Sequence, residues 1–228
     1  MRFTDKELII FDLDGTLIDS VPDLASALNH MLEALQRAPF SETLIRTWVG
    51  NGAQTLVKRG LSGSNEIDKT LDAELFEKAL NIFLNYYGQH LSETTHCYAN
   101  VKETLHKLKA AGYRLAIITN KPVDFVAPIL KALELEKLFE AYLGGDSLSR
   151  KKPDPLPLVH LSQKLNVSIK ASLMIGDSKN DILAANSAKM QSVGVTYGYN
   201  YNEPITHFEP DAIIDDFSQL LEFLIQSD

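Results

Sequence analysis

Two aspartates placed one residue apart are the first feature of the sequence that could perform chemistry. Asp12 and Asp14 lie within FDLDGTLIDS (residues 11–20), directly after an apolar run and directly before Gly15 and Thr16. An aspartate side chain is ionised at neutral pH, so Asp12 can attack an electrophile without a base to activate it. Asp14 is suited to protonate a leaving oxygen and later to take a proton from water. A surface turn is the alternative, because Asp and Gly are common turn residues.

Two later segments carry groups that could bind a phosphoryl group, whose negative charge an attacking aspartate cannot approach without cations and hydrogen-bond donors. Thr119 and Asn120 end the segment RLAIITN and can bind phosphate oxygens, although the same residues also suit a helix cap. Lys152 precedes Pro153 in RKKPDP and can neutralise both an attacking carboxylate and a phosphate. An isolated Lys-Pro is more commonly part of a solvated loop.

A further pair of aspartates, Asp177 and Asp181, lies in MIGDSKNDI (residues 174–182). Asp177 directly follows an apolar run, and Asp181 comes four residues later, which is one turn if a helix has begun. Oxygen ligands of this type suit Mg²⁺, which takes one or two carboxylates together with substrate oxygens. Asp177 could therefore complete a Mg²⁺ site begun by Asp12 and the main-chain carbonyl of Asp14, with Asp181 in support. The alternative is that both acids only cap the start of a helix.

Short apolar runs recur along the chain, and patterns typical of amphipathic helices lie between them. The runs predict buried strands at residues 8–11, 115–118, 173–175, 192–195 and 212–214. The patterns predict helices near residues 101–108, 126–133, 158–165 and 220–224. Such alternation predicts an α/β fold, an open parallel sheet with helices on both faces. Ligands of these sheets bind at the carboxyl ends of the strands, where Asp12, Thr119 and Asp177 lie.

Residues from about 20 to 92 interrupt the alternation, since they contain helical patterns and no convincing strand. Ser20 and Asp23 form a start that resembles a capping box. One apolar helical face follows over residues 24–35, and another over residues 71–86. The sequence thus predicts a helical insert between the first strand and the rest of the sheet.

Composition narrows the function classes that the chain can serve. It has 228 residues, 45% of them hydrophobic, and its net charge of -8 without a basic block gives no electrostatic footprint for nucleic acid or an anionic membrane. No apolar stretch approaches the roughly 20 residues that span a bilayer. The first residues lack the features of a secretory signal, and the single cysteine, Cys97, cannot form an internal disulfide. We therefore expect a cytoplasmic protein.

The polar groups occur in the order of the motifs of the haloacid dehalogenase superfamily of phosphohydrolases, and the sequence resembles that superfamily over nearly its whole length. The motifs are Asp12-Leu13-Asp14-Gly15-Thr16, then Thr119, then Lys152 before Pro153, then Gly176-Asp177 with Asp181. The resemblance implies a Rossmann-like core domain formed by residues 1–17 and 93–228. It also implies an inserted all-helical cap domain formed by residues 18–92.

The resemblance further implies a role for each group. Asp12 would be the nucleophile that forms an aspartyl-phosphate, and Asp14 would be the general acid and then the general base. The substrate would be bound by Gly15, Thr16, Thr119, Asn120 and Lys152. The Mg²⁺ ion would be held by Asp12, Asp14 and Asp177, with Asp181 in support. Dehalogenases usually lack the second aspartate, so Asp14 favours phosphoester chemistry.

Two segments resemble those of bacterial phosphoglycolate phosphatases, namely WVGNGAQTLVKRGL (residues 48–61) and GGDSLSRKKPDPLPL (residues 144–158). The Gly-Asn-Gly turn in the first segment would expose main-chain N–H groups that could meet a small carboxylate. Lys58 and Arg59 could assist, although an exposed helix face is the simpler expectation for both.

The sequence therefore predicts a Mg²⁺-dependent phosphatase that acts on a small phosphorylated metabolite, with 2-phosphoglycolate as the expected substrate, and a protein that is a monomer or a weak homodimer. One alternative is a sugar-phosphate mutase similar to β-phosphoglucomutase, which would share the fold and the nucleophile. Another is a non-catalytic sensor that binds a phosphorylated ligand and signals by cap closure. The intact set of Asp12, Asp14, Lys152 and Asp177 weighs against the sensor.

Overall fold

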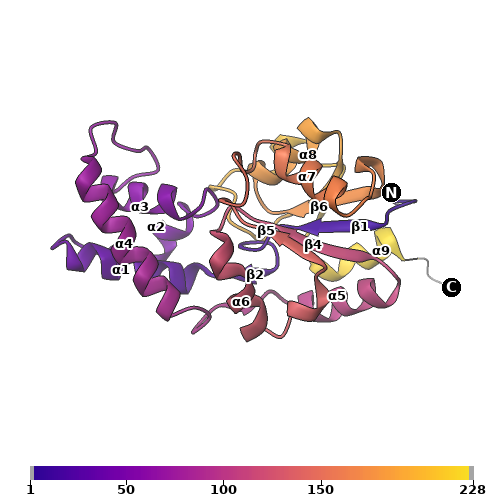
Figure 1. The fold of residues 1–228 in the computed structure, drawn as a ribbon, viewed down its shortest axis with the longest axis horizontal. Coiled ribbons are helices and arrows are strands. Elements are labelled where there is room, and N and C mark those ends of the chain that lie inside the picture. Colours follow the sequence, from indigo (N-terminus) through magenta and orange to yellow (C-terminus); the bar gives the residue numbers. More distant parts are fainter. Residues whose placement is uncertain (1–2, 226–228) are drawn as a thin grey trace.

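The computed structural model describes residues 3–225, which are built around a parallel sheet of six strands (Figure 1). The strand order is β5-β4-β1-β6-β7-β8. The strands are β1 (Leu8–Phe11), β4 (Arg114–Ile118), β5 (Ala141–Leu143), β6 (Ser172–Gly176), β7 (Gln191–Val195) and β8 (Ala212–Ile214). All five predicted strands are confirmed, and the short edge strand β5 was not predicted.

Alternate side chains of the strands enter two separate cores, one on each face of the sheet. Ile9 and Phe11 of β1 belong to one apolar cluster, whereas Leu8 and Ile10 belong to the other. The first cluster is completed by helices α5 (Val101–Ala110), α6 (Val126–Ala132) and α9 (Leu220–Leu224). The second is completed by α7 (Leu156–Lys164) and α8 (Lys179–Ala188). Figure 1 shows the two groups of helices on opposite sides of the sheet, which confirms the α/β architecture.

Five short 3₁₀ helices complete the connections between these elements. They are Val123–Phe125, Glu136–Leu138, Ile169–Ala171, Ile205–Phe208 and Phe217–Gln219. Among residues 3–225, no helix combines the length and the apolar character that crossing a membrane requires.

The segment between β1 and α5 forms a group of four helices with an apolar core of its own. The helices are α1 (Val21–Ala34), α2 (Glu42–Arg46), α3 (Ala53–Ser62) and α4 (Ala73–Gln89). A two-stranded antiparallel ribbon joins this group to the sheet, and its strands are β2 (Ile18–Asp19) and β3 (His96–Cys97). Figure 1 shows the four helices beyond one end of the sheet, as expected for a helical insert. The domain limits at residues 18 and 92 stay a prediction.

The start of α1 differs from the predicted capping box, because Ser20 makes no side-chain cap hydrogen bond. The Ser20 hydroxyl instead donates to Asp14, and its main-chain N–H donates to the Tyr199 hydroxyl. Asp23 accepts hydrogen bonds from the main-chain N–H and the hydroxyl of both Thr94 and Thr95. The two polar side chains therefore connect the beginning of the insert to the sheet and to the chain that returns from the insert, rather than capping their own helix.

Candidate active site

The site is assembled where three neighbouring strands end. Strand β1 pairs in parallel with β4 on one side and with β6 on the other. Asp12, Thr119 and Asp177 each directly follow one of these strands, so the sheet brings them to the same edge. The main-chain N–H of Asp12 also donates to the carbonyl of Ile175, 2.9 Å away. The predicted convergence of these three residues is confirmed.

A cluster of three buried carboxylates lies at this edge. Asp12, Asp177 and Asp181 each place a carboxylate oxygen within 4.8 Å of the others. Burial raises the pKa of Asp12 to about 7 despite the nearby Lys152 cation, and the Asp181 carboxylate adds to the rise. Burial and the neighbouring carboxylates of Asp181 and Asp12 also raise the pKa of Asp177 well above its usual value. Anionic oxygens held this close suit a hard divalent cation such as Mg²⁺.

Lys152 is inserted between two of these carboxylates. Its ammonium group lies 2.9 Å from Asp12 Oδ1 and 2.6 Å from Asp181 Oδ1. It also donates to the carbonyl of Ile118 at 2.6 Å, and the side chain is 1% exposed. Burial alone would lower the pKa of Lys152, but the two carboxylates outweigh this effect and raise it. The alternative of a solvated basic loop is therefore wrong for this residue.

Asp177 is oriented by a turn that only glycine fits well. The Thr16 hydroxyl donates to Asp177 Oδ1 at 2.8 Å, and the main-chain N–H of Tyr199 donates to Oδ2 at 2.7 Å. Gly15 has a positive φ of 89°, and a Cβ atom there would lie 2.3 Å from Asp177 Oδ2. Gly15 and Thr16 thus lie in the site, where Thr16 contacts the acidic cluster. Their predicted contact with substrate stays a prediction.

Asp14 turns its side chain away from the three-carboxylate cluster and toward Lys121. Asp14 Oδ1 lies 2.8 Å from the Lys121 ammonium, which burial alone would make less basic but whose pKa the Asp14 carboxylate raises. Because the Asp14 carboxylate is paired with Lys121, the main-chain carbonyl is the part of Asp14 that we predict to bind the metal. Lys121 was missed by the sequence reasoning, although it follows the Thr119-Asn120 pair directly. A lysine in a loop is usually solvated, and nothing in its neighbours indicated burial.

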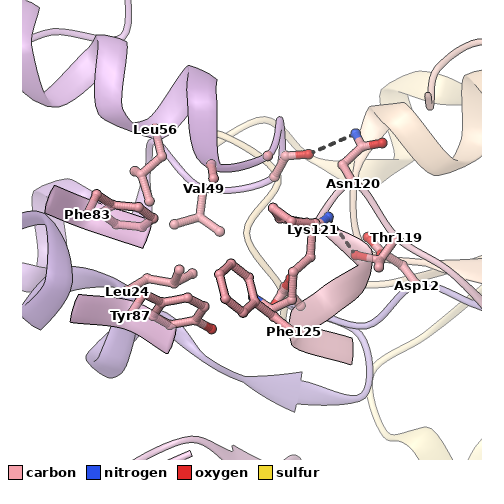
Figure 2. Close-up of a pocket in the computed structure, with 15 residues that line it drawn as sticks. Asp12, Leu24, Val49, Leu56, Phe83, Tyr87, Thr119, Asn120, Lys121 and Phe125 are labelled. Atoms are coloured by element: carbon pink, nitrogen blue, oxygen red, sulfur yellow. Dashed lines mark hydrogen bonds and ion pairs between the residues drawn. The ribbon is translucent and has the colours of Figure 1, made fainter. Parts of the chain in front are cut away.

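Thr119 and Asn120 make local and long-range hydrogen bonds respectively. The Thr119 hydroxyl accepts from the main-chain N–H of Lys121 at 3.2 Å. The Asn120 amide donates to the carbonyls of Gly50 and Lys152, at 3.2 and 3.0 Å, so it joins the insert to the lysine loop. Both residues line the same pocket as Asp12 (Figure 2). The helix-cap alternative is wrong for Asn120, because the next helical turn begins after Pro122.

The Gly-Asn-Gly turn of the insert covers the strand ends. The carbonyl of Gly50 accepts hydrogen bonds from the amides of Asn120 and Asn180, both at 3.2 Å. Lys151 donates to the carbonyl of Asn51 at 2.6 Å. Gly52 has a φ of 85°, and a Cβ atom there would lie 2.6 Å from the Asn120 carbonyl oxygen. The turn therefore approaches the sheet closely enough to require glycine.

Arg59 and Lys58 contact the insert itself. Arg59 is half-buried and donates to the carbonyl of Trp48 at 2.6 Å, so the prediction of an exposed helix face is wrong for it. The Lys58 ammonium lies 4.6 Å from the centroid of the Phe76 ring. Neither Arg59 nor Lys58 is among the described residues that line the pocket above Asp12.

That pocket lies between the insert and the sheet, and the empty space along its lining, open solvent included, amounts to about 470 Å³ (Figure 2). Its polar wall comes from the strand ends and consists of Asp12, Asp14, Thr119, Asn120 and Lys121. The opposite wall is mainly apolar and includes Leu24, Val49, Leu56, Phe83, Tyr87 and Phe125, with Gly50, Gly52, Ala53 and Pro122 completing the lining. Burial raises the pKa of Tyr87 to about 12, which keeps its hydroxyl protonated at neutral pH. The pocket thus places Asp12, Asp14 and the Lys121 cation against a confined and largely apolar space.

Comparison with known proteins agrees with this geometry. Residues 9–195 match the family model described as haloacid dehalogenase-like hydrolase. This span contains every candidate catalytic and metal-binding residue, from Asp12 to Asp181. The chain therefore belongs to the haloacid dehalogenase-like hydrolases.

Several known proteins match the chain along nearly its whole length. The phosphoglycolate phosphatase of Colwellia psychrerythraea is 53% identical over 221 residues, which cover 97% of this chain and 98% of that protein. The phosphoglycolate phosphatase of Vibrio parahaemolyticus is 47% identical and covers 100% of both chains. A crystal structure of a predicted phosphoglycolate phosphatase from Haemophilus somnus superposes with a TM-score of 0.89 at 45% identity, covering 96% of this chain and 98% of that chain.

Proposed function

We propose that this protein is a Mg²⁺-dependent phosphatase that hydrolyses 2-phosphoglycolate to glycolate and phosphate. The observation that carries the proposal is the buried contact of Lys152 with Asp12, beside the carboxylates of Asp177 and Asp181, where Asp12 itself lines the pocket under the insert. The full-length similarity to proteins named phosphoglycolate phosphatase supports the choice of substrate.

In the proposed reaction a carboxylate oxygen of Asp12 forms a bond to phosphorus while the bond from phosphorus to the glycolate oxygen breaks. Asp14 carries a proton in the substrate complex and donates it to that leaving oxygen. Asp14 then accepts a proton from water as the water oxygen attacks, and hydrolysis returns Asp12 and inorganic phosphate. Lys152 offsets the repulsion between Asp12 and the phosphoryl oxygens, and Thr119 donates a hydrogen bond to those oxygens. Gly15, Thr16 and Asn120 complete the binding site.

The acidic cluster fits a divalent cation by the chemistry of its donors. Asp12, Asp177 and the main-chain carbonyl of Asp14 would hold Mg²⁺, and Asp181 would support the site through its contact with Lys152. When bound, the ion would supply positive charge that neutralises the carboxylates and the phosphoryl oxygens.

The lining of the pocket favours a small substrate over a sugar phosphate. A hexose carries several hydroxyl groups that each need a hydrogen-bond partner when they are buried. Apart from the Tyr87 hydroxyl and the main chain of the Gly-Asn-Gly turn, the wall formed by the insert is apolar. It offers Leu24, Val49, Leu56 and Phe83, whose side chains provide no such partners. This arrangement supports a phosphatase for a short acid and weighs against the sugar-phosphate mutase.

Residues 18–92 act as a cap domain in this proposal, and residues 1–17 and 93–228 form the core domain, of which residues 1–2 and 226–228 lie outside the described part. The separate apolar core of the four helices supports the division. Water must be excluded while Asp12 attacks and admitted when the aspartyl-phosphate is hydrolysed. The cap therefore opens and closes once or more in each turnover.

Phosphate release from a panel of esters tests the proposal. The panel contains 2-phosphoglycolate, glucose 6-phosphate, β-glucose 1-phosphate with a bisphosphate primer, and a nucleoside monophosphate, each with Mg²⁺. We expect kcat/KM to be highest for 2-phosphoglycolate by at least about 10-fold. Conversion of glucose 1-phosphate to glucose 6-phosphate would favour the mutase, and ligand binding without turnover of any ester would favour the sensor.

A further inference from the structure

Tyr87 of helix α4 brings a polar group into the pocket that the proposed chemistry does not use. Its side chain is 1% exposed, and its hydroxyl has no hydrogen-bond partner within residues 3–225. A buried hydroxyl without a partner is unfavourable, and native structures usually avoid one. Tyr87 nevertheless lines the pocket together with Asp12 and Asp14 (Figure 2). The hydroxyl is therefore available to a ligand in the pocket.

Lys121 reaches the same space from the opposite wall. Its ammonium group lies 5.0 Å from the centroid of the Tyr87 ring and 2.8 Å from Asp14 Oδ1. An ammonium group has three donors, and the ion pair with Asp14 occupies one of them. Lys121 is also the one cationic side chain among the described residues that line the pocket. A second anion that enters the pocket would have Lys121 as its nearest cation outside the Asp12 cluster.

We propose that Lys121 and Tyr87 form the subsite that binds the carboxylate of the substrate. The inference rests on the proposed function, because it assigns the second anionic group of 2-phosphoglycolate. In that molecule one methylene group and one ester oxygen separate the carboxylate from phosphorus, so the carboxylate must be bound close to Asp12. Lys121 satisfies this condition, since its partner Asp14 lies two residues from the nucleophile.

The apolar wall of the pocket makes this pairing selective. Leu24, Leu56 and Phe83 present apolar surface to the pocket, and an ion pair is stronger in apolar surroundings than in water. A phosphate ester of the same size without a carboxylate would leave the Tyr87 hydroxyl and the free donors of Lys121 without an anionic partner. The cap thus contributes a specificity residue, Tyr87, while the core contributes Lys121 and the reacting groups. Substrate recognition is completed only when the cap is closed.

Two matched esters test the subsite. The kcat/KM values for 2-phosphoglycolate and for 2-hydroxyethyl phosphate, which lacks the carboxylate, are measured for the unmodified protein and for Tyr87→Phe, Lys121→Met and Tyr86→Phe. Tyr86 is the control, because it neighbours Tyr87 on α4 but directs its hydroxyl to Ser26. The kcat/KM for 2-phosphoglycolate divided by that for 2-hydroxyethyl phosphate should fall at least about 10-fold in Tyr87→Phe and further in Lys121→Met. It should not change in Tyr86→Phe.

The ratio separates this inference from its alternatives. A ratio that stays the same in Tyr87→Phe overturns the role of Tyr87. An equal loss on both esters in Lys121→Met would show that Lys121 serves Asp14 alone, which overturns the role of Lys121. Tyr87→Phe retains the ring and its packing, so it stays informative if Lys121→Met does not fold. Absence of phosphate release from both esters with the unmodified protein would instead overturn the proposed function itself.

Discussion

The ammonium group of Lys152 lies 2.9 Å from Oδ1 of Asp12, and both side chains are buried at the end of strand β1. An aspartate in such a place would be protonated near neutrality without a cation, since burial raises its pKa to about 7 even with Lys152 present. Lys152 therefore increases the fraction of Asp12 that is ionised and able to attack. In the proposed reaction the same cation would offset the negative charge of the phosphoryl oxygens that approach Asp12.

Replacement of this lysine should impair both turnover and stability. In Lys152→Met we expect kcat to fall at least about 100-fold, because the charge that offsets the phosphoryl oxygens is lost. The free energy of unfolding should fall by about 3–5 kcal/mol, because Asp12 and Asp181 lose their buried partner. Steady-state kinetics and urea unfolding measure the two effects. Arg150→Met is the control, since Arg150 is 72% exposed on the same loop. Equal effects in both variants would contradict the assigned role.

The effect of replacing Asp14, the proposed general acid, should depend on the leaving group of the ester. In Asp14→Asn, hydrolysis of 2-phosphoglycolate should slow about 10²–10⁴-fold, because its alkoxide needs a proton as it leaves. p-Nitrophenolate is stable without a proton, so the first step should persist with p-nitrophenyl phosphate while hydrolysis of the aspartyl-phosphate slows. Stopped-flow absorbance should show a burst of about one p-nitrophenolate per protein. Equal slowing of both esters with no burst would remove Asp14 from the proton transfer.

Mg²⁺ should stabilise the folded protein through the three-carboxylate cluster. At a concentration near 100 times its Kd, Mg²⁺ should raise Tm by about 5 °C or more relative to protein in EDTA. The effect should be lost in Asp177→Asn and retained in Asp124→Asn, which changes an exposed aspartate. Differential scanning calorimetry gives both values. A Tm of the unmodified protein that does not change when Mg²⁺ is added would argue against the metal site.

The stabilisation by Mg²⁺ should also depend on pH. In the absence of the ion, Asp12 in the folded protein keeps its proton up to about pH 7. In the unfolded chain Asp12 has the ordinary pKa of 3.8 and has already lost its proton at that pH. The Asp12 contribution to stability therefore decreases as pH rises from about 4 to 7. Mg²⁺ competes with this proton, so the rise in Tm should be larger at pH 8 than at pH 5.5. A larger rise at the lower pH would contradict the assignment.

Asp23 should stabilise the connection between the insert and the sheet. Burial opposes its ionisation, but the hydrogen bonds from Thr94 and Thr95 outweigh this and hold the pKa of Asp23 below its ordinary value of 3.8. The resulting stability is present above that value and is lost as pH falls through the lowered pKa. Asp23→Asn should lower the free energy of unfolding by about 1–3 kcal/mol at pH 7. The free energy of unfolding of this variant should also decrease less as the pH falls.

Urea unfolding between pH 2.5 and pH 7 measures the contribution of Asp23. Asp68→Asn is a matched control, because Asp68 also accepts hydrogen bonds from a threonine, Thr70, but is exposed. Stability that is the same in Asp23→Asn and Asp68→Asn across this range would contradict the role given to Asp23.

The sheet and the motifs were predictable because each rests on a local pattern. Apolar runs such as residues 8–11 fill both faces of a parallel strand, and the aspartates directly after them identify the functional edge. Strand β5 was not predicted, since its sequence Ala-Tyr-Leu is short and exposes Tyr142. Helix α8 has a weak apolar pattern in which alanines replace larger side chains. Such elements are specified mainly by the neighbours that cover them.

The contacts between the insert and the sheet could not be predicted from the sequence. The partners of Asp23 lie more than 70 residues away, at Thr94 and Thr95. The environment of Lys121 likewise depends on how Tyr87 of α4 is placed above it. Helical periodicity predicts which face of α4 is apolar, but it does not predict which residue of that face reaches the active site.

The most direct test of the central claim is phosphate release by Asp12→Asn. The variant keeps the size of the side chain and removes the attacking oxygen anion, so turnover of 2-phosphoglycolate should fall at least about 10⁴-fold with Mg²⁺ present. Intact-mass analysis before and after the assay verifies that the introduced asparagine has not been converted back to aspartate by deamidation. Full activity in a preparation shown to contain only asparagine at position 12 would contradict the claim that Asp12 is the nucleophile.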